Sequence, residues 1–512
     1  MANLVYFQYQ EGIEVQVRAN WGSRLGFLFA AIGSAIGLGN LWKFPYMAYR
    51  NGGGAFLIPY IFALLTIGVP LLIFEMALGQ KTGKATPLAF GSVSKKWEWL
   101  GWWPVILTSF GVGFYYMVVL SWCLNYFLYS FKLSWGAETD SFFHKVFLGL
   151  TSGAWNIGGI KWPIFIGAAF FWVFVWFIVV RGIKDGIEKA NKVLMPALFI
   201  MTVLFVVWSV TLPNASAGLK LYFTPDFTKL KDPHVWIDAL KQVFFSVGVG
   251  FGIMVTYASY LPKDSDTTTN ALITALADGF YSMFASIAIF ATIGYMAGTL
   301  GKDPATVIKG GPGLAFVVYP QAINLIPKGK VLFGAVFFFL LLAAGITSAI
   351  SLFENFVSAF VDKFGVSRKF AASILMLAGI VGSLIFSTGA GLYWLDIVDN
   401  YMMMAVMFVV YLEVMFLLAE VGLDKIKDFV DQNAKFVKVG TFWKIMMFVV
   451  PGFVGYLIVN DILKNLIHGY GGYPTSALAV GITVTLMTLV FALILWMPSG
   501  ATKRAARRGS KN

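Results

Sequence analysis

The stretch Gly33-Ser34-Ala35-Ile36-Gly37-Leu38-Gly39-Asn40 interrupts an apolar run that extends from about residue 24 to residue 50. A second stretch, Ser246-Val247-Gly248-Val249-Gly250-Phe251-Gly252, interrupts another apolar run, five such runs later. Glycine loosens a helix and lets other groups approach its backbone. In a membrane, unwound backbone is tolerated only where it is buried in protein or lines a cavity. Glycine-interrupted spans in corresponding halves of a chain therefore favour a transporter site near mid-membrane, although small residues also serve close helix packing.

The composition around these stretches is that of a membrane protein. Only 12% of the 512 residues are charged and 58% are apolar, whereas about a quarter of a soluble domain is charged. These numbers exclude soluble, disordered and disulfide-rich secreted classes. The single cysteine, Cys123, allows no disulfide within the chain, and three histidines without paired Cys/His spacing argue against a metal centre. We expect no enzyme activity, because no nucleophile–base pair stands out.

Twelve runs of about 20 mostly apolar residues predict an all-α membrane protein with twelve transmembrane helices. They lie at about 24–50, 54–79, 101–131, 163–180, 192–212, 236–260, 268–298, 331–361, 370–387, 393–420, 444–467 and 475–497. Most of the 38 lysines and arginines fall on one side if both termini are cytoplasmic, as in a cell (inner) membrane protein. The net charge of +13 then records topology and contact with lipid headgroups, so no nucleic-acid partner is expected.

Several motifs occur in a fixed order along the chain. They are W-G-S-R-L-G-F from Trp21, G-L-G-N-L-W-K-F-P-Y from Gly37, N-G-G-G-A-F from Asn51, P-L-L-I-F-E from Pro70, R-G-I from Arg181, G-I-E from Gly186 and T-Y-A-S-Y from Thr256. From about residue 17 to 420 the chain resembles the neurotransmitter:sodium symporter family, especially its prokaryotic amino-acid transporters such as the bacterial leucine transporter. The resemblance implies a five-plus-five inverted repeat with broken first and sixth helices, sodium coupling and alternating access.

The family pattern divides the chain into six parts. These are a cytoplasmic tail at 1–20, a first repeat of five helices at 21–212, an extracellular loop at 213–235, a second repeat at 236–420, two further helices at 421–497 and a basic cytoplasmic tail at 498–512.

The resemblance also implies two sodium sites and no organic cofactor. Site 1 would use the carbonyl of Ala35 with Asn40, Ser246, Asp278 and the substrate carboxylate. Site 2 would use the carbonyls of Gly33, Ile36 and Ala344 with the hydroxyls of Thr347 and Ser348. Sodium is a hard cation that prefers oxygen ligands, and broken helices free carbonyls to supply them.

The implied substrate is an amino acid held at the first break. Its carboxylate would meet the amides of Leu38 and Gly39, at the positive end of a half-helix, and the hydroxyl of Tyr116. Its amino group would meet carbonyls around Ala35, Phe245 and Ser246. Monoamine-carrying relatives have an aspartate at the position of Gly37. The side-chain pocket would be formed by Val112, Tyr116, Phe245, Gly248, Phe251, Ser348 and Leu352, which predicts a bulky apolar or aromatic amino acid.

Asp278 departs from the family pattern. The bacterial leucine transporter has an asparagine there and a glutamate at the position of Ser282, one helical turn later. We expect Asp278 to supply the negative charge of a charge-compensation site that also contains Tyr60, Gln242, Ser246 and Ser282, so that transport requires no chloride. The alternative is a hydrated or hydrogen-bonded carboxyl group without this role.

Two gates and one unwinding segment complete the expectations. The extracellular gate would be Lys43 with Asp399, looser than in relatives with arginine because lysine cannot form a bidentate pair. The intracellular gate would be formed by Arg18, Trp21, Tyr260 and Asp362. Gly186 and Pro196 would allow the fifth helix to unwind. An amino-acid-gated channel or receptor on the same fold and a proton-coupled permease stay open as alternatives, and the sequence leaves the oligomeric state unknown.

Overall fold

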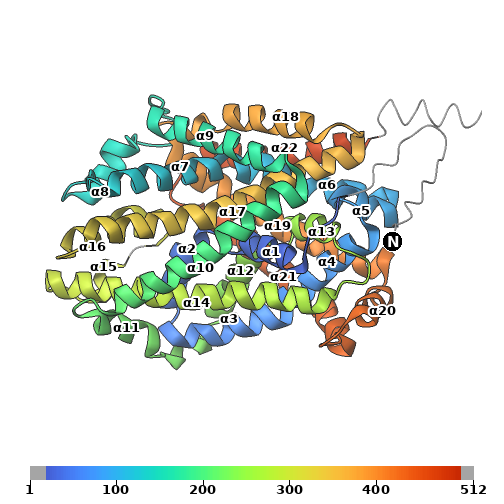
Figure 1. Cartoon of the computed structure of the whole chain (residues 1–512), viewed down its shortest axis with the longest axis horizontal. Coiled ribbons are helices and arrows are strands. Elements are labelled where there is room, and N and C mark those ends of the chain that lie inside the picture. Colours follow the sequence, from blue (N-terminus) through green and yellow to red (C-terminus); the bar gives the residue numbers. More distant parts are fainter. Residues whose placement is uncertain (1–18, 309, 498–512) are drawn as a thin grey trace, which may run out of the picture.

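The computed structural model describes residues 19–308 and 310–497, and these residues form an all-helical bundle. They contain no β-sheet, since the β-bridge between Ile160 and Thr388 is an isolated one between two loops. The long helices lie side by side along the longest axis (Figure 1). One end of the bundle carries α11 (Ala215–Phe223) and the other carries α20 (Leu423–Asn433), and we refer to them as the α11 end and the α20 end.

Nine helical segments of the described residues are long and apolar enough to cross a membrane. They contain α4 (Val69–Thr82), α7 (Gly113–Ser130), α9 (Trp162–Val179), α10 (Lys189–Val210), α14 (Thr267–Leu300), α17 (Lys330–Phe364), α19 (Gly391–Phe416), α21 (Gly440–His468) and α22 (Thr475–Trp496). A tenth span is the broken pair α1 (Arg24–Ala35) and α2 (Leu38–Arg50), which are bent by 52°. The prediction of a broken first helix is therefore confirmed.

The two remaining predicted spans are helical but shorter. The sixth consists of α12 (Pro233–Val247) and α13 (Ile253–Ala258), which are separated at residues 248–252. The ninth is α18 (Arg368–Gly382), with 15 residues. By length and composition alone, the structure thus supports nine spans, or ten with the bent pair, rather than all twelve.

Six π-helical turns lie within the described helices. They are Leu64–Gly68, Leu107–Val112, Phe142–Phe147, Ile183–Glu188, Leu314–Val318 and Leu417–Val421. Turns of this kind often occur at functional sites in proteins. Two of them precede residues of the candidate site directly, because Leu107–Val112 leads into α7 and Ile183–Glu188 leads into α10.

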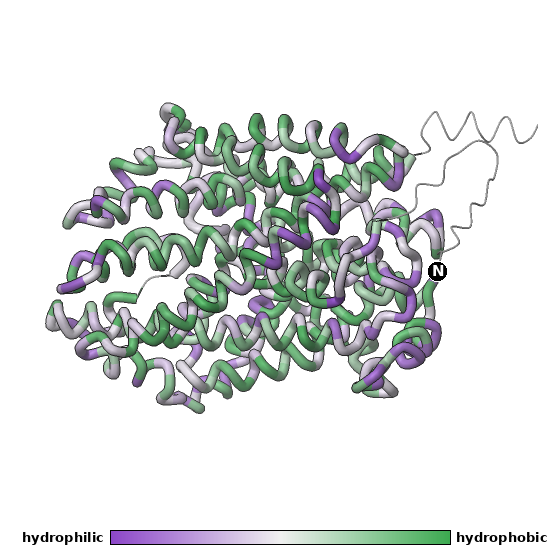
Figure 2. The backbone as a smooth tube through the Cα atoms, viewed as in Figure 1, coloured by the Kyte–Doolittle hydropathy of each residue, from purple (hydrophilic) through white to green (hydrophobic). Residues whose placement is uncertain are grey.

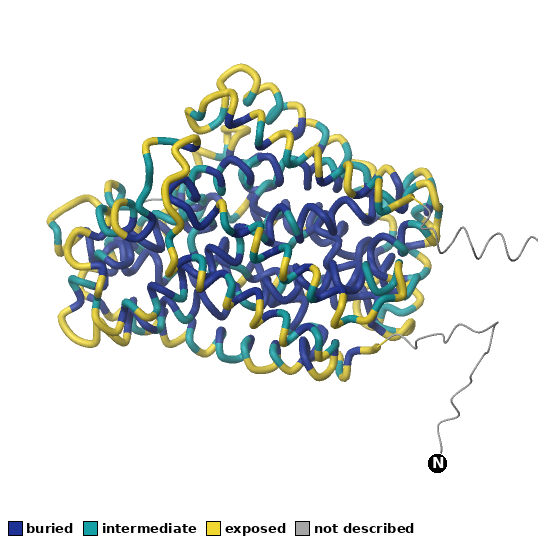
Figure 3. The backbone as a smooth tube through the Cα atoms, turned by 90° about the horizontal axis from the view of Figure 1, so that it is seen from above, coloured by how far each residue is buried: buried dark blue, intermediate teal, exposed yellow. Residues whose placement is uncertain are grey.

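Polarity follows the long axis of the bundle. Figure 2 shows hydrophobic residues along the long helices and hydrophilic residues gathered at α20 and at other helix ends. Buried residues occupy the centre and exposed residues the rim (Figure 3). Large apolar side chains on the flanks are nevertheless exposed, among them Val193 at 70%, Leu377 at 60% and Phe448 at 64%. Soluble monomers rarely expose such contiguous apolar surface, whereas lipid covers it in a membrane.

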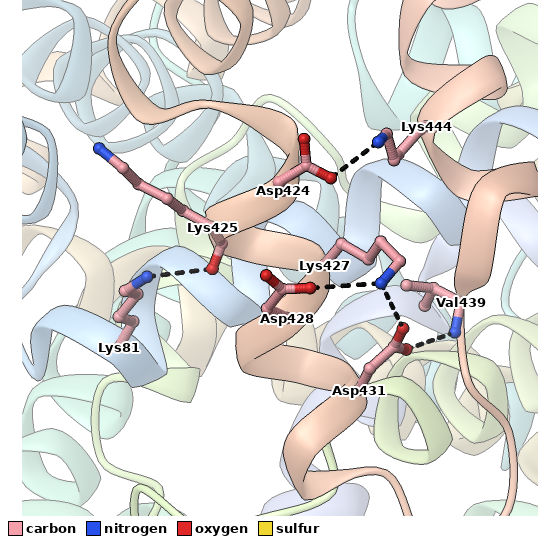
Figure 4. Close-up of polar contacts among 8 residues, drawn as sticks. All are labelled: Lys81, Asp424, Lys425, Lys427, Asp428, Asp431, Val439 and Lys444. Carbon is pink, nitrogen blue, oxygen red and sulfur yellow. Dashed lines mark hydrogen bonds and ion pairs between the residues drawn. The ribbon is translucent and has the colours of Figure 1, made fainter.

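The α20 end is held together by charged groups (Figure 4). Lys444 of α21 forms an ion pair of 2.7 Å with Asp424, and the backbone N–H of Val439 donates to Asp431 at 2.7 Å. Lys81 of α4 donates to the backbone carbonyl of Lys425 at 3.1 Å. The short helix α20 is thereby tied to two long helices that are far apart in the sequence.

Candidate functional site

The first break exposes backbone groups in the middle of the bundle. Helix α1 ends at Ala35 and α2 begins at Leu38, and Ile36 and Gly37 between them are extended. The last carbonyls of α1 and the first amides of α2 therefore have no partner within their own helix. The negative end of one half-helix and the positive end of the other thus meet at the same place.

The second break depends on three glycines. Gly248, Gly250 and Gly252 have φ angles of +69°, +77° and +73°. This left-handed region is readily accessible to glycine alone, so the alternating glycines are what lets the chain turn between α12 and α13.

Side chains from neighbouring helices satisfy the backbone of this second break. The amide of Gly250 donates to the carboxyl group of Glu75 at 2.6 Å. The side chain of Asn355 on α17 donates to the carbonyl of Phe251 at 2.9 Å. The unwound segment is therefore supported from α4 and α17, as irregular backbone at membrane depth requires.

Four of the predicted residues form one polar cluster between α2, α12 and α14. The side-chain amide of Asn40 donates to Asp278 at 2.7 Å, to the hydroxyl of Ser282 at 2.8 Å and to the hydroxyl of Ser246 at 3.2 Å. Ser246 also donates to Asp278 at 2.6 Å. All four residues are buried. The structure thus brings together the side chains predicted for site 1, while Ala35 lies at the adjoining end of α1.

Two further predicted residues border this cluster with unpaired polar atoms. The hydroxyl of Tyr60 and both polar atoms of the Gln242 side chain are buried and have no hydrogen-bond partner among the described residues. The Tyr60 hydroxyl faces Ser246 and Ser282. Buried polar groups are normally paired, so the unmet capacity of the Gln242 side chain fits an additional polar occupant such as a water molecule.

The residues predicted for site 2 form a second oxygen cluster between α1 and α17. The hydroxyl oxygen of Ser348 lies 3.4 Å from the carbonyl oxygens of Gly33 and Ile36 and 3.3 Å from that of Ala344. The hydroxyl of Thr347 donates to Ala344 at 2.9 Å. The hydroxyl oxygen of Ser348 also lies 3.3 Å from the carbonyl oxygen of Ser34. One hydroxyl hydrogen cannot satisfy the carbonyls of Gly33, Ser34 and Ile36, so these oxygens suit a hard cation.

The region predicted to hold an amino acid lies between these two clusters. The hydroxyl of Tyr116 faces Ser348 and the backbone of Leu38. A methyl group at Gly37 would lie 3.2 Å from the Ser348 hydroxyl and 3.7 Å from the Tyr116 hydroxyl. Gly37 therefore keeps the start of α2 accessible to both hydroxyls.

The predicted pocket wall is apolar and largely buried. The exposed fractions are 6% for Val112, 7% for Phe251 and 6% for Leu352. The ring of Phe245 packs against Gly39, where a methyl group would approach it to 2.7 Å. A methyl group at Gly248 would meet nothing within 4 Å, so this residue leaves open space.

Toward the α11 end, Lys43 and Asp399 line the same cavity of about 220 Å³ with Phe245. No ion pair joins the two charges in the part of the chain that the structure describes. The ammonium group of Lys43 lies 4.1 Å from the centre of the Phe245 ring, and Asp399 accepts a hydrogen bond of 2.6 Å from Tyr115. The role of Lys43 and Asp399 as a gate stays a prediction.

The same cavity is lined by an ion pair that sequence reasoning missed. Lys241 of α12 pairs with Asp461 of α21. The two residues are 220 positions apart, and no motif connects them.

Toward the α20 end, Trp21 packs over the end of the sixth span. Its indole N–H donates to the carbonyl of Tyr257 at 2.9 Å, and its backbone N–H donates to the carbonyl of Tyr260 at 3.3 Å. The hydroxyl of Tyr260 donates to Glu354 at 2.7 Å. Glu354 also forms an ion pair with Arg368, a residue that the sequence analysis missed. Its signal was available, because a carboxyl group within a membrane helix normally has a partner.

Of the two remaining gate residues, Asp362 lies within the described residues and Arg18 does not. Asp362 accepts a hydrogen bond of 2.7 Å from the amide of Ala85. Arg18, its expected partner, lies outside the described residues, as do almost all of the tail at 1–20 and the tail at 498–512.

The fifth span is helical at both residues that are predicted to let it unwind. Gly186 lies within the π-helical turn Ile183–Glu188, and Pro196 lies within α10. Because a proline lacks the N–H donor and a π-helical turn has looser geometry, the segment contains two weak points while it remains helical. Its unwinding stays a prediction.

Comparison with known proteins gives a consistent picture. The model of the "Sodium:neurotransmitter symporter family" matches residues 18–141 and 136–499. An uncharacterized sodium-dependent transporter of Methanocaldococcus jannaschii is 42% identical over 480 residues, covering 93% of this chain and 97% of that protein. A sodium-dependent dopamine transporter of Caenorhabditis elegans is 30% identical over 531 residues, covering 92% of this chain and 85% of that protein.

Proposed function

The chain belongs to the sodium:neurotransmitter symporter family, and on that premise we propose that it imports bulky apolar or aromatic L-amino acids together with sodium. Membership makes it a multi-pass membrane protein and a sodium-dependent transporter, not an enzyme. The observation that carries the choice of substrate is the first break, where the amides that begin α2 lie beside Gly37 and two hydroxyl groups.

An amino acid fits this break through both of its charges. Its carboxylate would be attracted to the positive end of α2 and to the Tyr116 hydroxyl. Its ammonium group would be attracted to carbonyls around Ala35, Phe245 and Ser246. Gly37 carries no carboxylate that would repel the substrate's own, and for that reason we favour a zwitterion over a simple amine, the substrate class named for the nematode relative.

The apolar wall supports a large substrate side chain. Val112, Phe251 and Leu352 offer apolar surface, and Gly248 leaves room that a larger residue would fill. Burial of a leucine- or tyrosine-sized side chain on such a wall is favourable by about 1.5–3 kcal/mol. We expect Leu, Met, Phe, Tyr or Trp as substrates.

Two sodium ions would couple transport to the gradient. Asn40, Ser246 and Asp278 would hold the first beside the substrate carboxylate, and the carbonyls near Ser348 would hold the second. The positive charge of sodium would be attracted to the carbonyl end of α1, and the substrate carboxylate would link the first ion to the positive end of α2. Because the second cluster bridges α1 and α17, sodium bound there would favour the state in which these helices are joined.

The carboxyl group of Asp278 would make chloride unnecessary. It lies within the same hydrogen-bonded cluster as Asn40 and Ser246, so its negative charge would balance the first sodium ion without an added anion.

Alternating access would involve the two ends of the bundle. The cavity at Lys43 and Asp399 would be the extracellular entrance, and Trp21 with Tyr260 would close the cytoplasmic side. This orientation places both termini in the cytoplasm, which requires an even number of crossings, as in the proposed twelve. The proposed repeats at 21–212 and 236–420 would each contain one broken helix.

Uptake into proteoliposomes tests the proposal. With sodium outside only, we expect radiolabelled leucine or tyrosine to accumulate above its outside concentration, and a sodium ionophore to abolish the accumulation. A binding panel of the twenty amino acids and dopamine would identify the substrate. Sodium-dependent binding of glycine or dopamine without binding of leucine or tyrosine would overturn the substrate proposal. Purely downhill flux would indicate a channel, and uptake driven by protons alone would indicate a permease.

A further inference from the structure

Asn191 of α10 is completely buried and only half satisfied. Its side-chain N–H donates to the carbonyl of Ile187 at 2.9 Å. Its side-chain oxygen has no hydrogen-bond partner among the described residues. Buried amide oxygens are normally paired, because their separation from water is otherwise uncompensated. The orphaned oxygen therefore indicates a ligand that the protein itself does not supply.

This oxygen lies against the backbone of Gly33. A methyl group at Gly33 would lie 2.9 Å from the Asn191 oxygen and 3.0 Å from the Cβ of Thr347. Gly33 and Thr347 are both members of the proposed site 2. Glycine at position 33 places no side chain between the Asn191 oxygen and Thr347. The Asn191 oxygen therefore borders site 2 from the side of α10.

The lysine next to Asn191 in the sequence is already paired with a carboxylate. Lys192, the next residue, forms an ion pair of 2.6 Å with Glu188. Glu188 in turn accepts hydrogen bonds from the amide of Gly22 at 2.6 Å and the hydroxyl of Ser23 at 2.8 Å. The positive charge nearest in sequence is thus engaged by a carboxylate that caps the start of α1.

We propose that the side-chain oxygen of Asn191 is an additional sodium ligand of site 2, on the side of the ion that faces α10. The inference rests on the proposed function, because site 2 is part of it. An amide oxygen is a hard, neutral donor, as the carbonyls of Gly33, Ile36 and Ala344 are, and it adds affinity without adding charge.

The position of Asn191 gives this ligand a role in release. It lies between Gly186 and Pro196, the residues at which the fifth helix is expected to unwind. Unwinding of that segment would withdraw the Asn191 oxygen while the ligands on α1 and α17 stay in place. Sodium would then be held by fewer oxygens at the moment at which the path along α10 opens to water.

The test is the sodium dependence of thermal stability in purified protein without substrate. Asn191→Leu removes the oxygen and nearly conserves volume, and Asn191→Ala serves as a second variant. We expect the half-saturating sodium concentration to rise on the order of tenfold in both, since one charge-assisted contact is lost. The sodium-free melting temperature of Asn191→Leu should not fall, because an unpaired buried group is removed.

Met195→Leu is the matched control, because the sulfur of Met195 lies 2.9 Å from the same methyl position at Gly33 but offers no oxygen. We expect this variant to keep the wild-type sodium dependence. Asn191→Asp, which retains an oxygen there, should bind sodium at least as tightly as the wild type. Equal shifts in Asn191→Leu and Met195→Leu would overturn the inference in favour of packing.

The two proposals fail in distinguishable ways. If the wild type shows no sodium-dependent stabilisation, the proposed sodium sites themselves are wrong. If the wild type is stabilised by sodium and Asn191→Leu responds to it identically, only the role of Asn191 is wrong.

Discussion

Asp278 is the acidic side chain of the polar cluster around Asn40. It accepts hydrogen bonds from Asn40 and Ser246, and it is fully buried. A buried carboxylate is costly unless hydrogen bonds and an opposite charge compensate it. Because the cluster supplies hydrogen bonds but no positive side chain, a bound cation is the natural partner for this residue.

Asp278→Asn should therefore weaken sodium-dependent uptake more than any other isosteric change in the cluster. Loss of the charge is expected to raise the half-saturating sodium concentration about ten- to a hundredfold, the equivalent of roughly 1.5–3 kcal/mol. The measurement is uptake into proteoliposomes, with chloride or gluconate as the anion. Wild-type uptake should be equal in both anions, and the variant should recover partly in chloride. Ser286→Ala, two turns further along α14, is the control and should resemble the wild type. A strict chloride requirement of the wild type would contradict the prediction.

Gly37 supports a second prediction at this scale. In Gly37→Asp, a carboxylate would stand beside the amides of α2 and compete with the carboxylate of the substrate. We expect the affinity for leucine or tyrosine to fall at least about tenfold, since like charges in close contact oppose binding. Competition binding at saturating sodium measures this. Gly37→Ala, which adds only a methyl group near Ser348, should lose less. Wild-type affinity in Gly37→Asp would refute the proposed place of the carboxylate.

Single residues show where sequence reasoning ends. Asn40, Ser246 and Asp278 could be grouped in advance because the family resemblance assigns their positions to one sodium site. Asn191 could not, since its surroundings are set by how distant helices pack. For Arg368, the carboxyl group of Glu354 signals that a partner exists but not which residue it is. Whether the Asn191 oxygen has a hydrogen-bond partner depends on which residues of other helices surround it, and the sequence alone does not specify them.

At the scale of elements, the lengths of apolar runs predicted the helices well. The span predicted at 24–50 is observed as Arg24–Ala35 and Leu38–Arg50, and that predicted at 475–497 as Thr475–Trp496. Glycine content also located the two breaks. The π-helical turns were not predicted, because an added residue within an apolar helix leaves no mark in composition.

Asp266, just before the start of α14, supports a prediction about how stability depends on pH. It caps α14 by accepting from the amide of Thr269 at 3.0 Å, and it also accepts from the amide of Lys435 at 2.9 Å. Burial would raise the pKa of Asp266, but these hydrogen bonds outweigh burial and the pKa is lowered. Its contribution to stability is therefore present above the unfolded pKa of about 3.9 and is lost as pH falls through the lower folded value.

Asp266→Ala should accordingly lower the melting temperature by about 1–2 °C, the equivalent of a cap of about 1 kcal/mol. We expect a constant difference from the wild type between pH 8 and pH 5, and a shrinking one below about pH 4. Asp232→Ala, at the exposed cap of α12, is the control and should have a smaller effect. A difference that grows on acidification would refute the role of the ionised carboxylate.

At the scale of the whole molecule, the arrangement joins helices that are remote in sequence. The candidate site draws on α1, α2, α7, α12, α14 and α17, while the charged contacts of α20 tie α4 to α21 at one end. The sequence supplied the class of fold through the resemblance of its motifs. It did not supply the Lys241–Asp461 pair, because contacts between remote helices depend on their relative rotation.

The proposed orientation can be tested with single cysteines. Cys123 is the only cysteine and is buried, so its replacement by alanine gives a background without reactive thiols. Lys229→Cys near the α11 end and Lys425→Cys in α20 both place a thiol at an exposed position. An impermeant maleimide should label the first in intact cells and the second only after permeabilisation. Labelling of both from the same side would contradict an orientation that places the two ends on opposite faces.

The π-helical turns fix how many residues each of these spans needs. Such a turn holds one residue more than the α-helix it interrupts, and each α-helical residue corresponds to about 100° of rotation. Deletion of one residue from Leu107–Val112 would therefore convert that turn into ordinary helix, while the parts of the span before and after it keep their facing. Deletion of one residue from α7, which has no residue to spare, would instead rotate one part of the span by about 100° and turn its apolar side away from its neighbours. We therefore expect alignments with relatives to show gaps of a single residue at this turn.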